Sequence, residues 1–359
     1  MHPQNCTQPT PPSRSKLPFR CTGSVVDSAP MVFLILGDAN ADLSGTLTRF
    51  PHEGDDAPMT SLAFSSGGSG ANVATALAKL GARARLVTAV GRDPGADVAL
   101  EAARRAGVDL SFVQTHPTLP TGHCFVAISP GGERTFMSFR GANAALSCSD
   151  GSAVWKDVKH LHVAGHALLE GAQRDATLEM MEEASRRAIP ISLDICLPLV
   201  RAWPAEVFAL APRILVLFGN KRELGALAPP GREACEAAIA ALALAGAPLV
   251  VGKLGAEGAV VAEGSGRTFL PACPAEVRDT TGAGDGFVAA FIYAIRRGAS
   301  PAHAAMLGNA AGALVVSRPG AAASLPGREE LAQALSAQGA SELAFQLFMK
   351  DTPHLGRET

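Results

Sequence analysis

The chain has 359 residues, of which 47% are hydrophobic, and its formal net charge at pH 7 is −2. This length and apolar content suffice for one large domain, or for a main domain with a smaller one. The balanced charge and scattered basic residues argue against a nucleic-acid partner and an anionic membrane surface. Proline or charge interrupts the apolar runs before the roughly 20 residues that span a bilayer, so we expect a soluble protein.

The seven cysteines are widely spaced and include no Cys-x-x-Cys pair. This spacing argues against a disulfide framework or a zinc site and favours free thiols in a reducing, cytoplasmic environment. Residues 1–30 are rich in Pro, Ser, Thr and Gln and lack the apolar region of a secretory signal. We expect them to form a disordered tail, with a start-site artefact or a transit role as alternatives.

Short apolar runs recur from residue 31 onward, and alanine-rich helical segments separate most of them. The runs that are typical of buried strands are 31–37, 84–90, 161–164, 189–195, 214–218, 248–252 and 259–262, and the helical segments are 97–106, 173–188 and 235–244. This alternation predicts a doubly wound α/β fold with a mostly parallel sheet flanked by helices. Ligands bind beyond the carboxyl ends of the strands in such folds.

Two stretches, about 43–66 and 112–142, break this alternation. In the second stretch, apolar and polar residues alternate within His123–Ser129 and again within Arg134–Phe139. Pro130-Gly131-Gly132 joins the two segments, and this pattern predicts a hairpin. A small β sheet inserted into an α/β core can cover a ligand as a lid, and a structural edge hairpin is the alternative. We therefore expect one domain over residues 31–345, followed by a frayed tail at 346–359.

Polar residues follow the first strand directly, within Gly37-Asp-Ala-Asn40-Ala-Asp42. Asn and Asp can pair with the adjacent hydroxyls of a sugar, although a turn or an Asx cap explains the same pattern. A glycine run that ends in Asn72 opens the next apolar helix. Together these segments indicate a substrate-binding end that contains Asn40, Asp42, Gly68 and Asn72.

The run Asp279-Thr-Thr-Gly282-Ala-Gly284-Asp285-Gly-Phe287 precedes an apolar helix. Its glycines can aim successive N–H groups at one point, and the positive end of the helix dipole favours a polyphosphate there. A carboxylate at that place suits a general base that takes a hydroxyl proton, while an ordinary helix cap is the alternative for Asp285. The sequence contains neither a P-loop nor the fingerprint G-x-G-x-x-G after a strand, which argues against a NAD-dependent oxidoreductase.

These two glycine blocks, with Gly91-x-Asp93, resemble the two signature regions of the ribokinase-like (PfkB) sugar kinases over roughly Val32 to Gly327. The resemblance implies a ribokinase-like fold with a β lid, ATP as phosphoryl donor and Mg²⁺ as cofactor. It assigns the sugar to Asn40 and Asp42, and makes Asp285 the base beside an anion cradle of Gly282, Ala283 and Gly284. It also makes a homodimer through the lid reasonable.

Asn220-x-x-Glu223 matches the family's N-x-x-E motif, whose glutamate orders the water shell of Mg²⁺. A capping box is the alternative, and both can hold together. The resemblance assigns the nucleotide to Asn220, Lys253, Gly255, Gly258, Gly284 and Asn309. It also suggests K⁺ activation, with backbone carbonyls as the main ligands, in a site formed by Asp279, Thr281, Val315, Arg318, Gly320 and Ser324.

Arg134 and Arg140 border the expected lid, where arginines are usually solvated. The functional alternative is that Arg140 binds a carboxylate, phosphate or hydroxyl of the substrate. His166 stands where ribokinases carry an acidic residue, which puts ribose in doubt. We therefore predict an ATP-dependent kinase acting on a small sugar or sugar acid. The alternatives are a nucleoside kinase of the same fold, with Phe64, Phe125 or Phe139 beneath the base, and a non-catalytic sugar-binding regulator.

Overall fold

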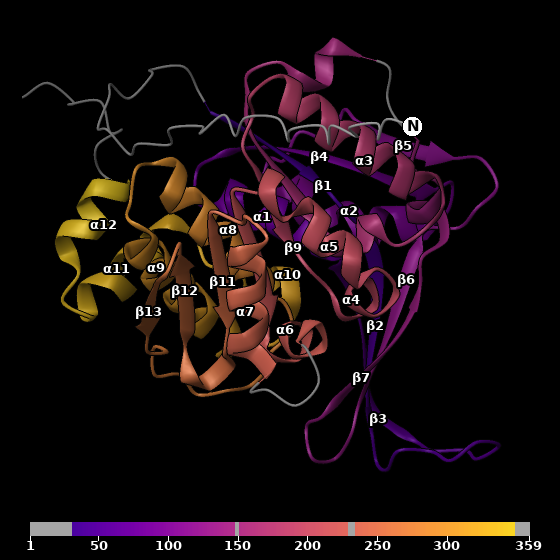
Figure 1. The fold of residues 1–359 in the computed structure, drawn as a ribbon. Helices are drawn as coiled ribbons and strands as arrows, with labels where there is room; N and C mark the ends of the chain where they lie inside the picture. The colour runs from indigo at the N-terminus through magenta and orange to yellow at the C-terminus, as the bar shows by residue number, and fades with distance from the viewer. Residues whose placement is uncertain (1–30, 148–150, 229–233, 349–359) are drawn as a thin grey trace, which may run out of the picture.

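The computed structural model describes residues 31–147, 151–228 and 234–348. The expected N-terminal tail and most of the expected C-terminal tail lie outside these residues. A nine-stranded sheet organises the described part in the order β13-β12-β11-β10-β9-β8-β1-β4-β5 (Figure 1). Its strands are β1 (Val32–Leu36), β4 (Arg83–Gly91), β5 (Val113–His116), β8 (Val158–Ala164), β9 (Ile191–Asp194), β10 (Val216–Asn220), β11 (Leu249–Lys253), β12 (Ala259–Glu263) and β13 (Gly266–Leu270).

The strands from β11 to β5 pair in parallel, and β12 and β13 add an antiparallel edge. The predicted α/β fold with a mostly parallel sheet is therefore confirmed. Helices cover both faces of the sheet, so β1 is buried on both sides and reads as an uninterrupted apolar run. Phe33 and Ile35 face one core cluster, while Leu34 and Leu36 face the other.

Helices that contribute to the first core cluster are α1 (Ser69–Lys79), α2 (Pro94–Arg105), α8 (Ala283–Arg296), α9 (Pro301–Val316), α11 (Arg328–Ala337) and α12 (Ser341–Phe348). Those that contribute to the second are α3 (Gly171–Arg186), α4 (Leu197–Ala202), α5 (Pro204–Leu210), α6 (Lys221–Leu227) and α7 (Ala234–Leu244). Short helical turns complete the chain: η1 (Gly141–Ala145), η2 (Ser152–Trp155), η3 (Gly165–Leu168), η4 (Ala211–Arg213), η5 (Gly255–Glu257) and α10 (Ala321–Ser324). No helix in the described ranges is long and apolar enough to cross a membrane.

A separate four-stranded sheet forms the lid, in the order β3-β2-β6-β7. Its strands are β2 (Asn40–Leu47), β3 (Met59–Gly67), β6 (Gly122–Ile128) and β7 (Arg134–Phe139), and its hairpins extend beyond the body of the molecule (Figure 1). The observed boundaries differ from the expected ones. The lid already begins at Asn40, and β5 pairs with β4 in the central sheet although it lies within 112–142. A period-two pattern indicates a strand but does not specify which sheet it joins.

Phe291 offers a direct test of the packing between α8 and the sheet. Its fully buried ring meets Phe218 edge-on, with 5.2 Å between the ring centroids, and stacks on Phe287 at 6.2 Å. We expect Phe291→Ala to lower the free energy of unfolding by about 3–5 kcal/mol, because it leaves a cavity between helix and sheet. Urea denaturation measures this change. Phe345→Ala on α12, where the ring is 54% exposed, is the matched control and should change stability by less than about 1 kcal/mol. Equal losses in both variants would contradict this packing.

Candidate active site

The candidate site lies where the carboxyl ends of the parallel strands meet the first turns of α1 and α8. A cavity of about 730 Å³ opens there between the lid hairpin and the segment that leads into α8. Its walls combine lid residues with the predicted catalytic segment: Asn72, Gly131, Gly132, Glu133, Arg134, Phe136, Val277, Arg278, Thr280, Thr281, Gly282 and Asp285. The fold thus brings the two glycine blocks of the sequence together.

Asp285 is the third residue of α8, and its carboxylate points across to α1. The hydroxyl of Ser69 donates to Oδ1 at 2.7 Å, and Nδ2 of Asn72 donates to Oδ2 at 2.8 Å. Gly282 is the N-cap, in the left-handed conformation with φ of 80°. Asp285 therefore does not cap its own helix, and the capping alternative does not describe this side chain.

Burial raises the pKa of Asp285 to about 6, and the negative charge of Asp194 acts in the same direction. The hydrogen bonds from Ser69 and Asn72, together with the charge of Lys253, oppose this rise. A carboxylate with a pKa just below neutrality is ionised at pH 7 and still basic enough to accept a proton. This balance is what a general base requires.

Asp42 lies on β2 beside Asp285, packed against the bare backbone of Gly67. A Cβ added to Gly67 would lie 2.0 Å from Oδ2 of Asp42, so only glycine leaves room for this carboxylate. Burial, followed by the charge of Asp285, raises the pKa of Asp42 to about 7. Two buried oxygens here, Oδ1 of Asp42 and Oδ1 of Asn72, have no hydrogen-bond partner among the described residues. Both are acceptors that a polyhydroxylated ligand can satisfy.

Asn40 is held in place by Asn143, a fully buried residue of η1. Nδ2 of Asn143 donates to Oδ1 of Asn40 at 2.9 Å and to the carbonyl of Ala39 at 3.2 Å, while its Oδ1 accepts from the Ala39 amide at 3.1 Å. Sequence reasoning did not single out Asn143. The available signal was an asparagine placed among small residues directly after a lid strand.

Arg140 is largely buried, unlike a solvated strand arginine. Its Nη2 donates to Oδ1 of Asp38 at 3.1 Å, and Gln173 donates to the same oxygen at 2.9 Å. Arg140 also donates to Gln173. The expected solvated state is therefore wrong for Arg140, because Asp38 and Gln173 hold it at the end of β1. His166 lies nearby in η3, and burial lowers its pKa, which favours a neutral ring.

Gly68 lies at the N-cap of α1 with φ of 87°. A Cβ there would lie 2.4 Å from the carbonyl oxygen of Asp38. Both the conformation and the close approach require glycine, so this residue brings the start of α1 against the loop that carries Asp38.

The motif at Asn220 forms the capping box of α6. Oδ1 of Asn220 accepts hydrogen bonds from the backbone N–H groups of Arg222 and Glu223, both at 2.9 Å. Oε2 of Glu223 accepts one from the backbone N–H of Asn220 at 2.7 Å. Burial raises the pKa of Glu223 to about 7, with the charge of Lys253 opposing the rise. The capping alternative is thus confirmed, and it fixes Glu223 at the crevice.

Lys253, the last residue of β11, is paired with Asp194 at the end of β9. Its Nζ donates to the two carboxylate oxygens at 2.6 and 2.7 Å. In the loop that follows, Gly258 has φ of 108°, and a Cβ there would lie 2.1 Å from the carbonyl oxygen of Leu270. Gly255 also has a positive φ, of 64°.

Asn309 lies in α9, and its Nδ2 donates to the carbonyls of Leu270 and Pro271 at 3.2 and 2.9 Å. These bonds tie α9 to the chain that leaves β13. The sequence offered no structural reason for an asparagine in this helix, and the tie to the backbone supplies one.

Asp279 joins three segments that are distant in sequence. Its oxygens accept from the amides of Thr281 at 2.8 Å and Gly320 at 2.9 Å, and Nη2 of Arg134 lies 2.9 Å from Oδ1. Arg134 also donates to Oγ1 of Thr280 at 3.3 Å. The lid is therefore tied to the start of α8 through Arg134, and the solvated position expected for a strand arginine is wrong for this residue.

The region of the expected monovalent cation contains no carboxylate cluster. In the part of the chain that the structure describes, no group of three or more His, Cys, Asp or Glu residues could hold a metal ion. Arg318 pairs with Glu330, and the hydroxyl of Ser324 donates to the carbonyl of Pro319 at 2.8 Å. The carbonyl of Val315 accepts from the Arg318 amide at 3.2 Å.

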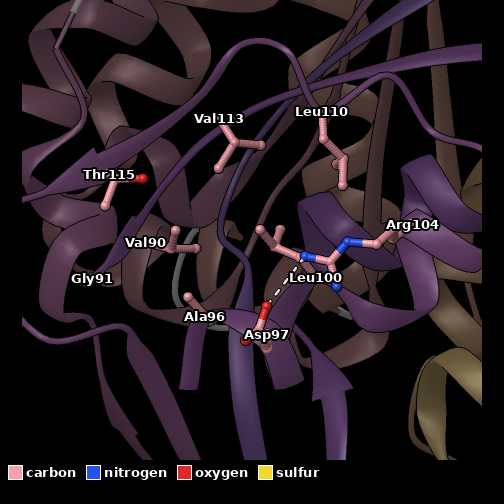
Figure 2. A pocket seen from close by; sticks show the side chains of 9 residues that line it. All are labelled: Val90, Gly91, Ala96, Asp97, Leu100, Arg104, Leu110, Val113 and Thr115. Atoms are coloured by element: carbon pink, nitrogen blue, oxygen red, sulfur yellow. Dashed lines mark hydrogen bonds and ion pairs between the residues drawn. The ribbon is translucent and has the colours of Figure 1, made fainter. Parts of the chain in front are cut away.

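A second cavity, of about 360 Å³, lies between α2 and the strands β4 and β5 (Figure 2). Val90, Leu100 and Val113 supply apolar walls, while Asp97 and Arg104 pair at 3.4 Å. None of the residues predicted for the site lines this cavity. It is therefore separate from the candidate active site.

The fold and the site define a phosphotransferase that acts on an alcohol group. The model of the pfkB family of carbohydrate kinases matches residues 33–328, and the chain belongs to this family. A ribokinase from Arabidopsis thaliana is 30% identical over 325 residues, which cover 87% of this chain and 83% of that protein. A 2-dehydro-3-deoxygluconokinase from Bacillus subtilis is 34% identical over 291 residues, 77% of this chain and 88% of that one.

A solved structure agrees with these relatives. The Arabidopsis thaliana ribokinase, complexed with ribose and ATP, matches with a TM-score of 0.72 and 27% identity. The match covers 86% of this chain and 99% of that one. The expected family and carbohydrate kinase class are therefore confirmed.

Asp42 should make the stability of the protein depend on pH. Its pKa is about 7 in the folded state and near 3.8 when unfolded, so folding favours the protonated form. This contribution is present at low pH and is lost as the pH rises through about 7. We expect Asp42→Asn to be more stable than the wild type by up to about 4 kcal/mol at pH 8.5, and by less than half of that amount at pH 5. Urea denaturation at the two pH values measures the effect, with the exposed Asp175→Asn as control. A difference that does not depend on pH would contradict the raised pKa of this buried carboxylate.

Proposed function

We propose that this protein transfers the γ-phosphoryl group of Mg·ATP to a hydroxyl of a small sugar or sugar acid, with Asp285 as general base. The observation that carries the proposal is the Asp285 carboxylate itself. It lies at the first turn of α8, is held by Ser69 and Asn72, lines the large cavity and has a pKa of about 6. A carboxylate and a polyphosphate repel each other. A role as proton acceptor explains why a carboxylate would nevertheless lie at a polyphosphate site.

In the proposed reaction the sugar hydroxyl attacks the γ-phosphorus and its proton passes to Asp285. A new O–P bond forms to the sugar oxygen while the bond between the γ-phosphorus and the β-phosphate oxygen breaks, which releases ADP. The N–H groups of Gly282, Ala283, Gly284 and Asp285 offset the charge on the phosphates. When bound, Mg²⁺ would offset negative charge on the phosphates of ATP. The buried carboxylate of Glu223 suits this cation, and with Asn220 it would order the water ligands of the ion.

The sugar would lie between β2, α1 and η3, bound by Asn40, Asp42, Gly68, Asn72, Arg140 and His166. The unpartnered oxygens of Asp42 and Asn72 support this placement, since each can accept a hydrogen bond from a sugar hydroxyl. Named relatives act on ribose or on 2-dehydro-3-deoxygluconate, so both remain candidate substrates. The ATP of the plant ribokinase complex supports ATP as donor. Nucleotide contacts are proposed for Asn220, Lys253, Gly255, Gly258, Gly284 and Asn309.

The strand register of the lid sheet determines which aromatic side chains could stack on the base of a nucleoside substrate. Phe64, Leu43, Phe125 and Met137 are register partners across the four strands, so their side chains share one face. Asp42 is on the opposite face. Phe136 also lies on that opposite face and lines the cavity. A nucleoside base would therefore stack on Phe136 rather than on Phe64, Phe125 or Phe139.

We further propose K⁺ activation and a cytoplasmic location. Asp279, Thr281, Val315, Arg318, Gly320 and Ser324 would surround the cation, mainly through backbone carbonyls. Equal activity in K⁺ and in tetramethylammonium would remove this part of the proposal. A reducing compartment suits the free cysteines of the described residues, Cys124, Cys196, Cys235 and Cys273, and subcellular fractionation tests the location.

The decisive experiment measures ADP release by the purified protein with Mg·ATP across pentoses, hexoses, keto sugar acids and nucleosides. We expect one class to be phosphorylated and Asp285→Asn to lower kcat by about 1,000-fold or more while ATP binding is retained, because the hydroxyl proton then has no acceptor. kcat/KM should decrease at pH values below about 6, because Asp285 becomes protonated there. Asp175→Asn on α3 is the matched control. A wild-type-like rate in Asp285→Asn would show that another group is the base.

The outer face of the lid supports a homodimer. Leu62, Phe64, Met137 and Phe139 lie on this face, and each is at least half exposed; Phe64 is 70% exposed. A contiguous apolar surface of this kind marks a protein interface. We expect a dimer mass by sedimentation, and Phe64→Asp should shift it to a monomer. Phe345→Asp on α12 is the control with a similarly exposed ring. A monomeric wild type, or a dimer that survives Phe64→Asp, would contradict the interface.

A further inference from the structure

We infer that the cavity between α2 and the strands β4 and β5 is a binding site for a free α-amino acid with an apolar side chain. The cavity is separate from the candidate active site, so the inference goes beyond the proposed function and does not depend on it. Its volume of about 360 Å³ lies within the range of small-molecule sites (Figure 2). It is found at one edge of the central sheet, because β5 is the last strand in the order.

The apolar lining of the cavity is the first argument. Val90 and Leu100 are buried, and Leu110 and Val113 pack against the same core cluster. Protein interiors are close-packed, and side chains beside an unfilled space lose contacts that a bound group would restore. An apolar group of a few carbon atoms would therefore gain free energy by leaving water for this cavity.

A pair of opposite charges beside the cavity is the second argument. Asp97 and Arg104 lie seven residues apart on α2, about two helical turns, and Leu100 lies between them on the same face. Nη2 of Arg104 lies 3.4 Å from Oδ1 of Asp97. The side chains of Arg104 and Asp97 are 55% and 85% exposed, whereas Leu100 is 7% exposed. The two charges therefore lie on the solvent side of the cavity, and its interior is apolar.

The two charges select the class of ligand. In a free amino acid the ammonium nitrogen and a carboxylate oxygen are about 3 Å apart, because one Cα carries both groups. This spacing is close to that of the paired Asp97 and Arg104 atoms, so the ammonium can meet Asp97 while the carboxylate meets Arg104. The existing pair opposes this exchange only weakly, since it is exposed to solvent. Asp97 would repel a phosphate or a lone carboxylate, Arg104 would repel a lone amine, and a peptide terminus carries only one of the two charges.

Helix α2 connects this cavity to the lid. The hydroxyl of Ser66 on β3 donates to the carbonyl of Val98 at 2.6 Å and accepts from the N–H of Ala102 at 3.1 Å. At the start of the helix, Oδ2 of Asp93 accepts from the N–H of Thr121 at 2.8 Å, directly before β6. A ligand that stabilises α2 against β4 and β5 would therefore also stabilise the lid strands β3 and β6.

Calorimetric titration of the full chain with L-leucine tests the inference. We expect a Kd on the order of 1 mM or lower, and the absence of binding at about 20 mM would overturn the inference. Glycine should bind about tenfold more weakly or worse, because it lacks the side chain that fills the cavity. 3-Methylbutylamine and 4-methylpentanoate each lack one charge of leucine and should bind about fivefold more weakly or worse. Glycine or either single-charge analogue binding as tightly as leucine would contradict a site for an apolar zwitterion.

Variants of the two exposed charges locate the binding with little risk to folding. Arg104→Ala and Asp97→Ala should each raise the Kd for leucine about fivefold or more, because each removes one charge-assisted contact. Arg105→Ala is the matched control and should change the Kd less than about twofold, since Arg105 pairs with Glu101 on the exposed surface of the same helix. Val113→Phe fills the cavity and should abolish binding. An unchanged Kd in Arg104→Ala and Asp97→Ala, or in Val113→Phe, would overturn the inference.

Hydrogen exchange measures the connection to the lid. Leucine should slow amide exchange in α2 and β3 and leave α12 unchanged, and slowing confined to other elements would show that leucine binds elsewhere. Because these readouts are binding and exchange, a protein that binds leucine but phosphorylates no sugar would refute the proposed function and leave this inference standing.

Discussion

The junction of α1 and α8 at Asp285 is the interaction on which the rest of the site depends. Ser69 and Asn72 come from the first turn of α1, and together they fix a carboxylate that belongs to α8. Both helices start at the carboxyl edge of the parallel sheet, so their N–H groups and this carboxylate share one crevice. In the proposed reaction the polyphosphate, the acceptor hydroxyl and the proton acceptor would meet in this crevice.

The site concentrates negative charge in a partly dry environment. Asp42, Glu223 and Asp285 all have raised pKa values, with burial as the largest cause in each case. This arrangement opposes folding, because each ionised carboxylate is less well solvated than in the unfolded chain. Under the proposed function, the same carboxylates would accept the hydroxyl proton and attract the cations that accompany a polyphosphate. Lys253 and Arg140 offset part of the charge through Asp194 and Asp38.

The two faces of the four-stranded lid sheet have different surroundings. Its inner face carries Asp42 and Phe136, and Arg134 ties it to Asp279 and Thr280 at the entrance to α8. Its outer face is apolar. One small sheet therefore lines the cavity with one face and carries the surface of the proposed dimer on the other.

The sequence by itself determined the α/β class, the order of most strands and helices, and the two glycine segments with Asp285, Asn40 and Asp42. It could do so because buried parallel strands read as continuous apolar runs, and because glycine is required where backbone must approach closely. The tertiary structure decided which sheet each period-two strand joins and which partners fix each site residue. Asp38, Asn143, Gln173 and Asp194 went unnoticed because their partners lie 59 to 135 residues away. Only packing brings such groups together, and packing also sets the burial that shifts their pKa values.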